Sequence, residues 1–214
     1  MEDAIQPYYS RKMDNWSIIN SVEINNGKVF ANGRLVHDTE NDFTLASKEL
    51  YKKYSKAYIK FFKMDALSKL GFLTAEILLK DFNLENIDMN EIALVVGNSN
   101  ATKDTDLKYL QTMREQPSPA VFVYTLPNIL VGEICIRHGF KGQNVFYISG
   151  KFDEEELYEN IELLINNSTT DYVIGGWVDF INPNDYKSIL YLIGKDSKSS
   201  KFAINNLKRL NNIK

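Results

Sequence analysis

Short apolar runs and stretches with helical spacing alternate along this chain. The first two runs, 16–24 and 28–35, lie on either side of Asn25-Asn26-Gly27, and an Asn-Gly pair between apolar runs predicts a β-hairpin. The run Ile92–Asn98 is apolar almost throughout, which is typical of a strand buried on both faces of a sheet. Three later runs, at 145–149, 172–180 and 187–194, also predict strands.

The stretches between these runs predict helices. Lysines and aromatic residues occupy different faces over 48–63, which predicts an amphipathic helix with a break near Ser55. The clearest helical pattern covers 63–81, where one apolar face contains Met64, Leu67, Leu70, Gly71, Thr74, Ile77 and Leu78. Between 98 and 116, the spacing of Leu107, Leu110 and Met113 predicts a loop followed by a helix.

The second half of the chain contains two further predicted helices. One begins at Pro127, with Thr125 as its N-terminal cap and Gly139 ending it in a left-handed turn. The other covers 157–167. Residues 1–15 are predicted to be an irregular lead-in, and 195–214 a short amphipathic tail with apolar residues at Phe202, Ile204, Leu207 and Leu210.

This alternation of helices and apolar strands predicts an α/β fold, with helices layered on a mostly parallel five-stranded sheet. The chain has 214 residues, of which 44% are hydrophobic, enough for one core. We therefore predict a single domain over 1–214.

Charge and cysteine content narrow the classes of function. The net charge is −3, whereas a nucleic-acid-binding protein usually has a basic surplus, so no nucleic-acid partner is expected. No run reaches transmembrane length and the first residues are acidic, so neither a membrane span nor a signal peptide is expected. Cys135 is the single cysteine, which excludes an internal disulfide and favours the cytoplasm.

Cys135 and His138 are also the residues that suggest an independent enzyme. They lie three positions apart on a predicted helix, so their side chains can meet as a Cys-His pair or as half of a metal site. A metal site needs two further ligands, however, and Cys135 lies between Ile134 and Ile136, which favours a place in the core. No phosphate-binding glycine loop is present, and neither a metal nor a cofactor is predicted.

Four short motifs follow one another between 118 and 144: Ser118-Pro119, Pro127-Asn128, Arg137-His138-Gly139 and Gly142-Gln143-Asn144. Their order resembles the nucleophile region of β-ketoacyl synthases, in which Ser-Pro, Pro-Asn, Arg-x-Gly and Gly-Pro-Asn precede a strand and a Thr-Ala-Cys triplet. The helix that starts at Lys63-Met64-Asp65 is similar to the family's Arg-Met-Asp helix. The resemblance covers about Lys56 to Gly194, which implies the N-terminal half of a thiolase-like fold.

The nucleophile position of that family is occupied by a lysine here. Counting on from Asn144, the Thr-Ala-Cys triplet falls on Ser149, Gly150 and Lys151. A helix N-terminus stabilises a thiolate, but four acidic residues follow Lys151 from position 153 and would repel one. We therefore interpret Lys151 as a solvated residue before a capped helix, with no catalytic role.

Other parts of the chain depart from the family pattern. The glycine turn that follows the first strand in ketosynthases is missing, so 1–47 are interpreted as a remodelled N-terminal region. The family's second half, with two catalytic histidines, would follow position 194. His37 and His138 are in neither of the positions that the family uses for catalysis. The resemblance therefore implies a pseudoenzyme.

The resemblance also implies that the chain binds a partner subunit. Ketosynthases are dimers that pair the strand before the nucleophile across the two-fold axis, and a segment before Pro-Asn reaches into the neighbour's acyl tunnel. The corresponding strand residues are Asn144, Val145, Phe146, Tyr147, Ile148 and Ser149, and the tunnel residues are Phe122, Val123, Tyr124 and Thr125. The expected partner is an intact ketosynthase, as in chain length factors, with a homodimer as the alternative.

The lysine face over 48–63 has several interpretations. Lys52, Lys56, Lys60 and Lys63 form a basic stripe beside aromatic residues. It can dock an acyl carrier protein or an anionic surface, or it can simply face solvent over a buried aromatic face. The resemblance points to fatty-acid or polyketide biosynthesis of the aryl-polyene or flexirubin type. The alternatives are a stand-alone acyltransferase and a protein that binds acyl chains or an acyl carrier protein.

Overall fold

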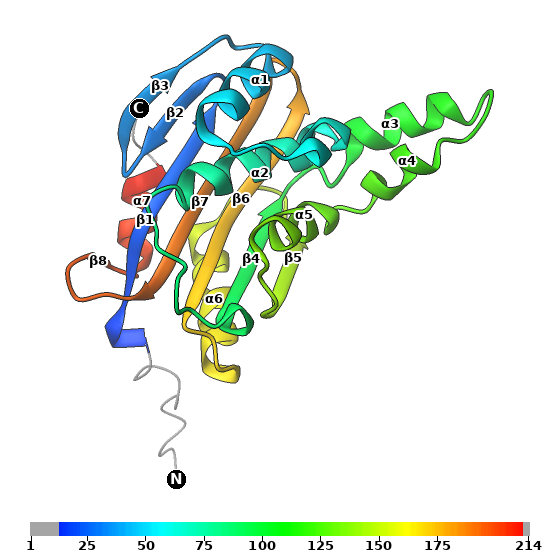
Figure 1. The fold of residues 1–214 in the computed structure, drawn as a ribbon. Coiled ribbons are helices and arrows are strands. Elements are labelled where there is room, and N and C mark those ends of the chain that lie inside the picture. Colours follow the sequence, from blue (N-terminus) through cyan, green and yellow to red (C-terminus); the bar gives the residue numbers. More distant parts are fainter. Residues whose placement is uncertain (1–12, 212–214) are drawn as a thin grey trace.

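A mixed sheet runs through the computed structural model, which describes residues 13–211 (Figure 1). Its strands lie in the order β3 (Arg34–Asp38), β2 (Lys28–Ala31), β1 (Trp16–Asn25), β7 (Asp185–Lys195), β6 (Tyr172–Asn182), β4 (Ile92–Asn98) and β5 (Asn144–Ile148). A short eighth strand, β8 (Ser200–Lys201), pairs with β1. Most of the predicted irregular lead-in lies outside the described residues.

The prediction of a mostly parallel five-stranded sheet is wrong, although each of the predicted apolar runs forms a strand and the run 28–35 forms two. The parallel pairings join β4 to β5 and to β6, and the other strand pairs of the described residues are antiparallel. For β6 and β7 the reason is the length of their connection. A tight turn joins β6 to β7, whereas parallel neighbours need a crossover of about a dozen residues or more.

Two Asn-Gly turns extend the sheet beyond β1. Asn26 and Gly27 have φ of 46° and 86° and connect β1 to β2, which confirms the predicted hairpin. Asn32 and Gly33 repeat the geometry, with φ of 49° and 75°, and connect β2 to β3. Positive φ at both central residues matches the right-handed twist of the flanking strands. The second hairpin was absent from the sequence prediction.

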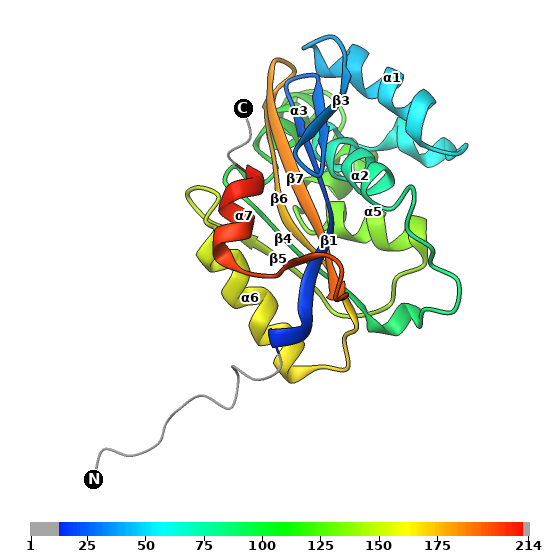
Figure 2. The ribbon, with the colours of Figure 1, turned by 90° about the vertical axis from the view of Figure 1, so that its left-hand side faces the viewer.

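Helices cover both faces of the sheet (Figures 1 and 2). On one face α1 (Phe43–Tyr54), α2 (Ala66–Leu78) and α5 (Ile129–His138) pack on inward-facing residues that include Leu94 and Val96 of β4. On the other face α6 (Glu154–Asn167) and α7 (Ile204–Asn211) cover Ala93 and Val95. Alternate residues of β4 therefore belong to two separate cores, as a strand buried on both faces requires.

Helix α2 is the most buried helix. Every residue from Leu70 to Leu79 is buried, because α2 lies between the sheet, α1 and α5. The prediction of a single apolar face is therefore too narrow. Asp65 starts the helix as its N-cap, where its carboxylate accepts a hydrogen bond from the Ser68 backbone N–H at 2.9 Å.

The predicted helix over 48–63 consists of two pieces. Helix α1 starts earlier than predicted, at Phe43 after the N-cap Asp42, and ends at Tyr54 because Ser55 is extended. A separate 3₁₀ turn, η2 (Ile59–Lys63), follows. The predicted break near Ser55 is confirmed, and the helical spacing that aligns the lysines ends there.

An arm projects from the body at one end of the sheet (Figure 1). It consists of α3 (Lys103–Thr112), α4 (Pro119–Phe122) and the 3₁₀ turn η4 (Val123–Thr125). The predicted helix after residue 98 is thus confirmed. Its apolar residues Leu107, Leu110 and Met113 are nevertheless exposed, so they do not belong to the core of this chain.

The ends of α5 confirm one cap and correct another. Gly139 ends the helix with φ of 76°, as predicted. The helix begins at Ile129, however, and the predicted cap Thr125 instead donates its hydroxyl hydrogen to the Phe122 carbonyl at 2.7 Å. The amphipathic tail forms β8 and α7, whose Leu207 is buried. Two further 3₁₀ turns, η1 (Met13–Asn15) and η3 (Met89–Glu91), precede β1 and β4.

Candidate functional site

Strand β5 forms one outer edge of the sheet and contains the predicted pairing residues. It pairs with β4 on one side, and no other described strand lies on its free side. Val145 and Ile148 are 39% and 57% exposed, while Phe146 and Tyr147 are half-buried and Asn144 is exposed. Ser149 follows the strand and donates its backbone N–H to the Asn98 carbonyl at 3.0 Å. The edge is therefore apolar and available for pairing.

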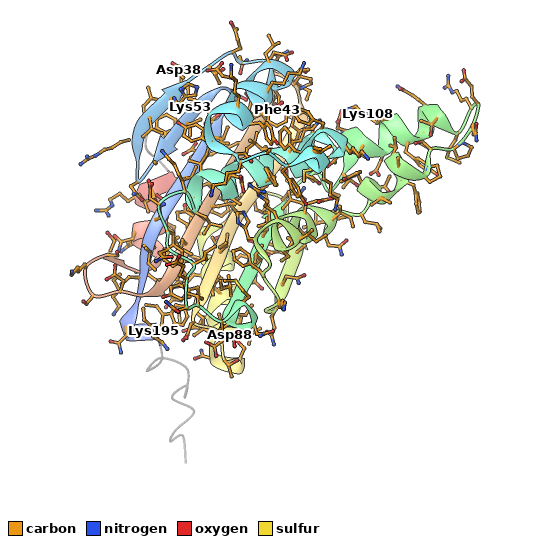
Figure 3. The ribbon with its side chains drawn as sticks, viewed as in Figure 1. Asp38, Phe43, Lys53, Asp88, Lys108 and Lys195 are labelled. Carbon is orange, nitrogen blue, oxygen red and sulfur yellow. The ribbon has the colours of Figure 1, made fainter. Side chains whose placement is uncertain are left out.

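The opposite edge of the sheet is surrounded by charge. His37 of β3 lies between Glu49 and Lys53 of α1, with its Nε2 2.7 Å from the Glu49 carboxylate. Figure 3 shows Asp38 and Lys53 at this end of the molecule. The His37 and Thr39 side chains hold the pKa of Glu49 below its ordinary value, Thr39 contributing most. The two edges of the sheet thus differ in chemistry.

The four predicted tunnel residues point in different directions. Phe122 and Val123 are 51% and 47% exposed at the base of the arm. Tyr124 is buried, and its hydroxyl donates a hydrogen bond to Glu133 Oε1 at 3.0 Å. Thr125 uses its carbonyl to accept a hydrogen bond from the Thr102 hydroxyl at 2.9 Å, which fastens the arm to the start of α3. The exposed pair is available to a partner, while the other two position it.

Glu133 is a buried carboxylate that anchors this segment to α5. Besides the Tyr124 hydroxyl it meets the Lys60 ammonium, with Nζ 2.9 Å from Oε2. Burial, followed by the charge of Glu133, raises the pKa of Tyr124 well above its usual range, so the hydroxyl stays protonated and donates. Glu133 was not among the predicted site residues, since an acid in an apolar helix gives no indication of its partner.

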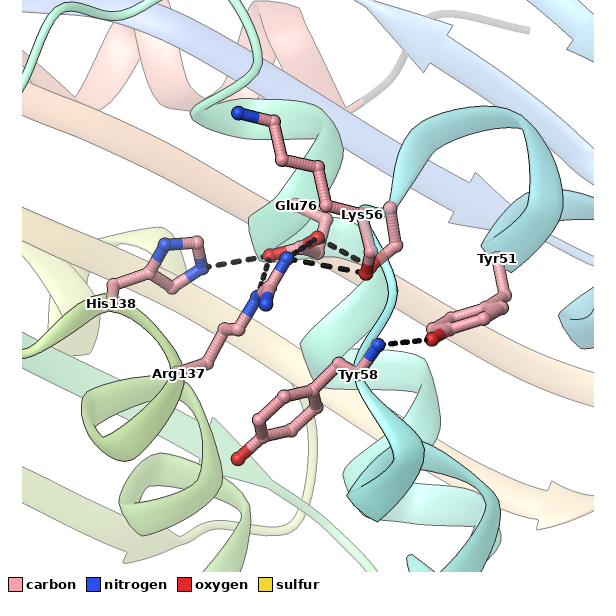
Figure 4. A network of polar contacts seen from close by, with 7 residues as sticks. Tyr51, Lys56, Tyr58, Glu76, Arg137 and His138 are labelled. Atoms are coloured by element: carbon pink, nitrogen blue, oxygen red, sulfur yellow. Dashed lines mark hydrogen bonds and ion pairs between the residues drawn. The ribbon is translucent and has the colours of Figure 1, made fainter.

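A second polar network fixes the C-terminal end of α5 (Figure 4). Glu76 of α2 is buried and accepts hydrogen bonds from Arg137 Nε and Nη2 at 2.9 and 3.0 Å. The Ser55 hydroxyl donates to the same carboxylate at 2.6 Å, and His138 Nε2 lies 3.3 Å away. The Lys56 carbonyl accepts a further bond from Arg137 at 3.4 Å. The network therefore joins α2, α5 and the segment after α1.

The four lysines of the predicted basic stripe lie in three different segments and differ in their contacts. Lys60 is engaged with Glu133. Lys52, Lys56 and Lys63 are exposed, and they belong to α1, to the extended segment and to η2 respectively. The three exposed lysines remain available to an acidic partner.

Lys151 lies where the sequence placed it, just before α6. It is exposed in a bend two residues ahead of Asp153, the N-cap of α6, whose carboxylate accepts from the Glu155 and Glu156 backbone N–H groups. These hydrogen bonds hold the pKa of Asp153 below its ordinary value. The helix N-terminus is therefore occupied by its own cap, and Lys151 stands outside it.

The Cys135 and His138 side chains lack the setting of a catalytic pair. Burial raises the pKa of the Cys135 thiol to about 11, which disfavours the nucleophilic thiolate. Burial also lowers the pKa of His138, whose ring stacks on Phe140 and faces Glu76. Among the described residues, no group of three or more His, Cys, Asp or Glu side chains could hold a metal ion.

Asp179 of β6 was also missed by the sequence prediction. Its carboxylate accepts hydrogen bonds from the Ser99 backbone N–H and hydroxyl, at 2.9 and 2.7 Å, and from Trp177 Nε1 at 2.8 Å. Ser99 follows β4, so these bonds tie the ends of two parallel strands together. The Ser99–Asp179 pair thus has a structural role in joining β4 to β6.

Within the described part of the chain, none of the helices is by itself long and apolar enough to cross a membrane. One bent pair, Pro119–Thr125 with Ile129–His138, meets the length and composition required, with a bend of 100° between its helices. This pair contains the exposed Phe122 and Val123 and the buried Glu133 network.

Comparison with known proteins gives a likeness of fold. No family model and no curated protein matches the sequence. Among solved structures, the ishigamide ketosynthase/chain length factor matches with a TM-score of 0.62 and 12% identity, over 87% of this chain. The structure of the ketosynthase ApeO in complex with its chain length factor ApeC from Xenorhabdus doucetiae matches with a TM-score of 0.57 and 15% identity, over 85% of this chain.

A third similar structure, AntDE:AntF, is a type II polyketide synthase acyl carrier protein in complex with its ketosynthase bound to the hexaketide. It matches with a TM-score of 0.57 and 13% identity, over 92% of this chain. The present chain spans 63% of the matched ishigamide chain, 79% of the ApeO–ApeC chain and 65% of the AntDE:AntF chain. The fold is thus that of ketosynthase and chain-length-factor structures, which confirms the thiolase-like fold class.

Proposed function

We propose that this chain is a non-catalytic ketosynthase-like subunit that pairs with an intact ketosynthase and shapes its acyl pocket. The observation that carries the proposal is the apolar free edge of β5. A free strand edge presents unpaired N–H and C=O groups and invites the addition of another strand. A partner strand satisfies these groups and covers Val145 and Ile148.

The arm supports the same proposal. It contains the exposed apolar residues Leu107, Leu110, Phe122 and Val123. Figure 1 shows the arm projecting on the side of the molecule where β5 forms the edge of the sheet. Apolar surface of this kind is typical of the buried centre of a protein interface. Phe122 and Val123 are the residues of the arm that reach the partner's acyl pocket, and Tyr124 holds them through Glu133.

The surroundings of the two candidate nucleophiles support a role without catalysis. Lys151 lies outside the α6 N-terminus, and the Cys135 thiol has a raised pKa without an activating base. The matched structures, which contain ketosynthases and chain length factors, support a role in polyketide or fatty-acid biosynthesis. Within that class we favour pathways of the aryl-polyene or flexirubin type, with the exposed lysines Lys52, Lys56 and Lys63 facing the acyl carrier protein.

Co-expression with the intact ketosynthase of the same organism tests the proposal. We expect the two proteins to elute as one complex in size-exclusion chromatography, and removal of this chain to change the product length or abolish activity. The proposal is wrong if the proteins elute as two peaks and the larger subunit alone has full activity.

A separate experiment tests the absence of catalysis. The purified chain is incubated with an acyl-carrier thioester and analysed by intact-protein mass spectrometry. We expect no stable mass increase. An acyl adduct on Lys151 or Cys135 would overturn the assignment and favour a stand-alone acyltransferase.

A further inference from the structure

A groove of 390 Å³ opens on the face of the molecule that carries α1, η2, α2 and the arm. Small-molecule sites usually have volumes of roughly 300–1,000 Å³, so the groove has the size of a ligand site. Its floor is apolar and consists of buried side chains, namely Phe43, Phe61, Met64, Tyr124 and Phe180. None of its lining residues comes from β5 or from the segment around Lys151.

Lysines from four elements surround this floor. Lys48 comes from α1, Lys63 from η2, Lys69 from α2 and Lys108 from α3. Figure 3 labels Phe43 and Lys108, which bound the groove from the side of α1 and from the base of the arm. Apolar floor and cationic rim thus belong to one site.

Most of this positive charge is unpaired. Lys108 forms an ion pair with Asp104 at 2.6 Å. For Lys48, Lys63 and Lys69 the structure gives no ion pair with any described residue. Three ammonium groups therefore remain to attract an anion to the groove.

Lys69 is the lysine placed to bind that anion. Its side chain is half-buried, and its Nζ lies 5.8 Å from the centroid of the Phe61 ring. Burial lowers the pKa of Lys69, and the charges of Lys108 and Lys48 lower it further, against an opposing effect of Asp65. Burial and repulsion from neighbouring lysines both disfavour the charged form of Lys69. A bound anion would offset both effects, because it pairs with the ammonium group and screens the repulsion.

Asp65 is the acidic residue of the groove lining, and its oxygens are already engaged. One accepts from the Ser68 backbone N–H at 2.9 Å and the other from the Thr105 hydroxyl at 2.7 Å. Burial raises the pKa of this carboxyl. Asp65 therefore serves as a helix cap and leaves the rim of the groove cationic.

We infer that the groove binds a small organic anion with an apolar body, of the class of medium-chain carboxylates. The carboxylate pairs with Lys69 at the rim, and the hydrocarbon part lies over Phe61 and Phe43. A small ligand fits better than an acidic protein surface, which would meet the lysines but leave the recessed apolar floor unfilled. The inference goes beyond the proposed pairing, because the groove is complete within this chain.

Isothermal titration of the full chain with sodium dodecanoate tests the inference. We expect saturable one-to-one binding. Lys69→Met should weaken it about tenfold or more, since a hydrogen bond to a charged group is worth about 1.5–3 kcal/mol. Methyl dodecanoate, which has no charge, should bind wild type and K69M equally. Lys141→Met is the matched control, because it is the same substitution at an exposed lysine outside the groove. The K141M variant should bind dodecanoate as tightly as wild type does.

A second variant tests the position of the hydrocarbon. Ala120 is exposed and lines the groove, so Ala120→Trp should fill the groove without disturbing the core and should abolish dodecanoate binding. The inference is overturned if dodecanoate binding to the wild-type chain does not saturate, or if K69M or A120W binds dodecanoate as tightly as wild type. It is also overturned if an acidic carrier protein binds the groove and dodecanoate does not. A variant that cannot pair through β5 should still bind dodecanoate, so failure of pairing and failure of the groove are separable results.

Discussion

The two edge strands have the same length and both expose apolar side chains, but they differ in charge. Strand β3 contains three ionisable residues among five, Arg34, His37 and Asp38, and its His37 is held by charged residues of α1. The five residues of β5 include no acid or base other than the phenol of Tyr147. Charged residues on an edge strand oppose the addition of another strand. The difference in charge favours β5 over β3 as the edge that adds a strand in the proposed complex.

The largest effect is expected when β5 is given the chemistry of β3. Ile148→Lys would place an unpaired charge inside the proposed interface, which should weaken pairing with the ketosynthase by about a thousandfold or more. Pairing is measured by sedimentation of the mixed subunits. Leu35→Lys on β3 is the matched control, because Leu35 is 53% exposed, close to the 57% of Ile148. Equal affinities of I148K and wild type would show that β5 is not the interface.

The next largest effect is expected in the Glu76 network, which fixes the C-terminal end of α5. Glu76→Gln removes the buried charge that pairs with Arg137 and leaves the half-buried guanidinium without its counterion, so we expect the free energy of unfolding to fall by about 2 kcal/mol. Urea denaturation followed by circular dichroism measures this change. Glu115→Gln, at an exposed position of the arm, should have no comparable effect. If both variants unfold at the same urea concentration as wild type, the network does not support this end of the molecule.

A smaller effect on stability is expected when the pH is lowered, because His138 belongs to the same network. Burial holds the pKa of His138 below its ordinary value of 6.5 in the folded chain, so the unfolded chain binds a proton first. The stability contributed by neutral His138 is therefore present above about pH 6.5 and is lost as the pH falls toward the lowered value. Denaturation midpoints between pH 7.5 and 5.5 should decrease in wild type and decrease less in His138→Gln. Identical pH profiles would contradict this account.

The smallest effect is expected at Lys151. Its side chain is exposed and the α6 N-terminus is capped by Asp153, so Lys151→Ala should change neither the unfolding midpoint nor the affinity for the ketosynthase. Both are measured as for the preceding variants. A loss of pairing in K151A would extend the interface from β5 to the start of α6.

Local patterns predicted a large part of the fold. The strands at 92–98, 145–149, 172–180 and 187–194, the hairpin at Asn26-Gly27 and the helix end at Gly139 each depend on residues close in sequence, and each is confirmed within a few positions. The second hairpin at Asn32-Gly33 carried the same Asn-Gly pattern. It was missed because the apolar residues on both sides of this pair continue over 28–35, which predicts one strand where the structure has β2 and β3.

Contacts between distant segments could not be predicted in the same way. The acids Glu76 and Glu133 sit in otherwise apolar helices, and no sequence pattern shows that Arg137 and Lys60 approach them. Likewise, the apolar spacing of Leu107, Leu110 and Met113 predicts a helix, but whether that face is buried depends on what packs against it. Lys69 and Phe43 meet at one groove only because α1 and α2 lie side by side.

The sequence by itself determined most of the strands, the first hairpin and the helix end at Gly139, and it placed Lys151 just before a capped helix, because these are properties of residue type and local spacing. Tertiary structure alone decided that β7 pairs antiparallel with both β6 and β1, that β5 is left at an open edge, and that lysines from four elements surround one apolar floor. The physical reason is that strand pairing and burial depend on which segments meet in space. The local sequence of a segment does not predict which distant segment will pack against it.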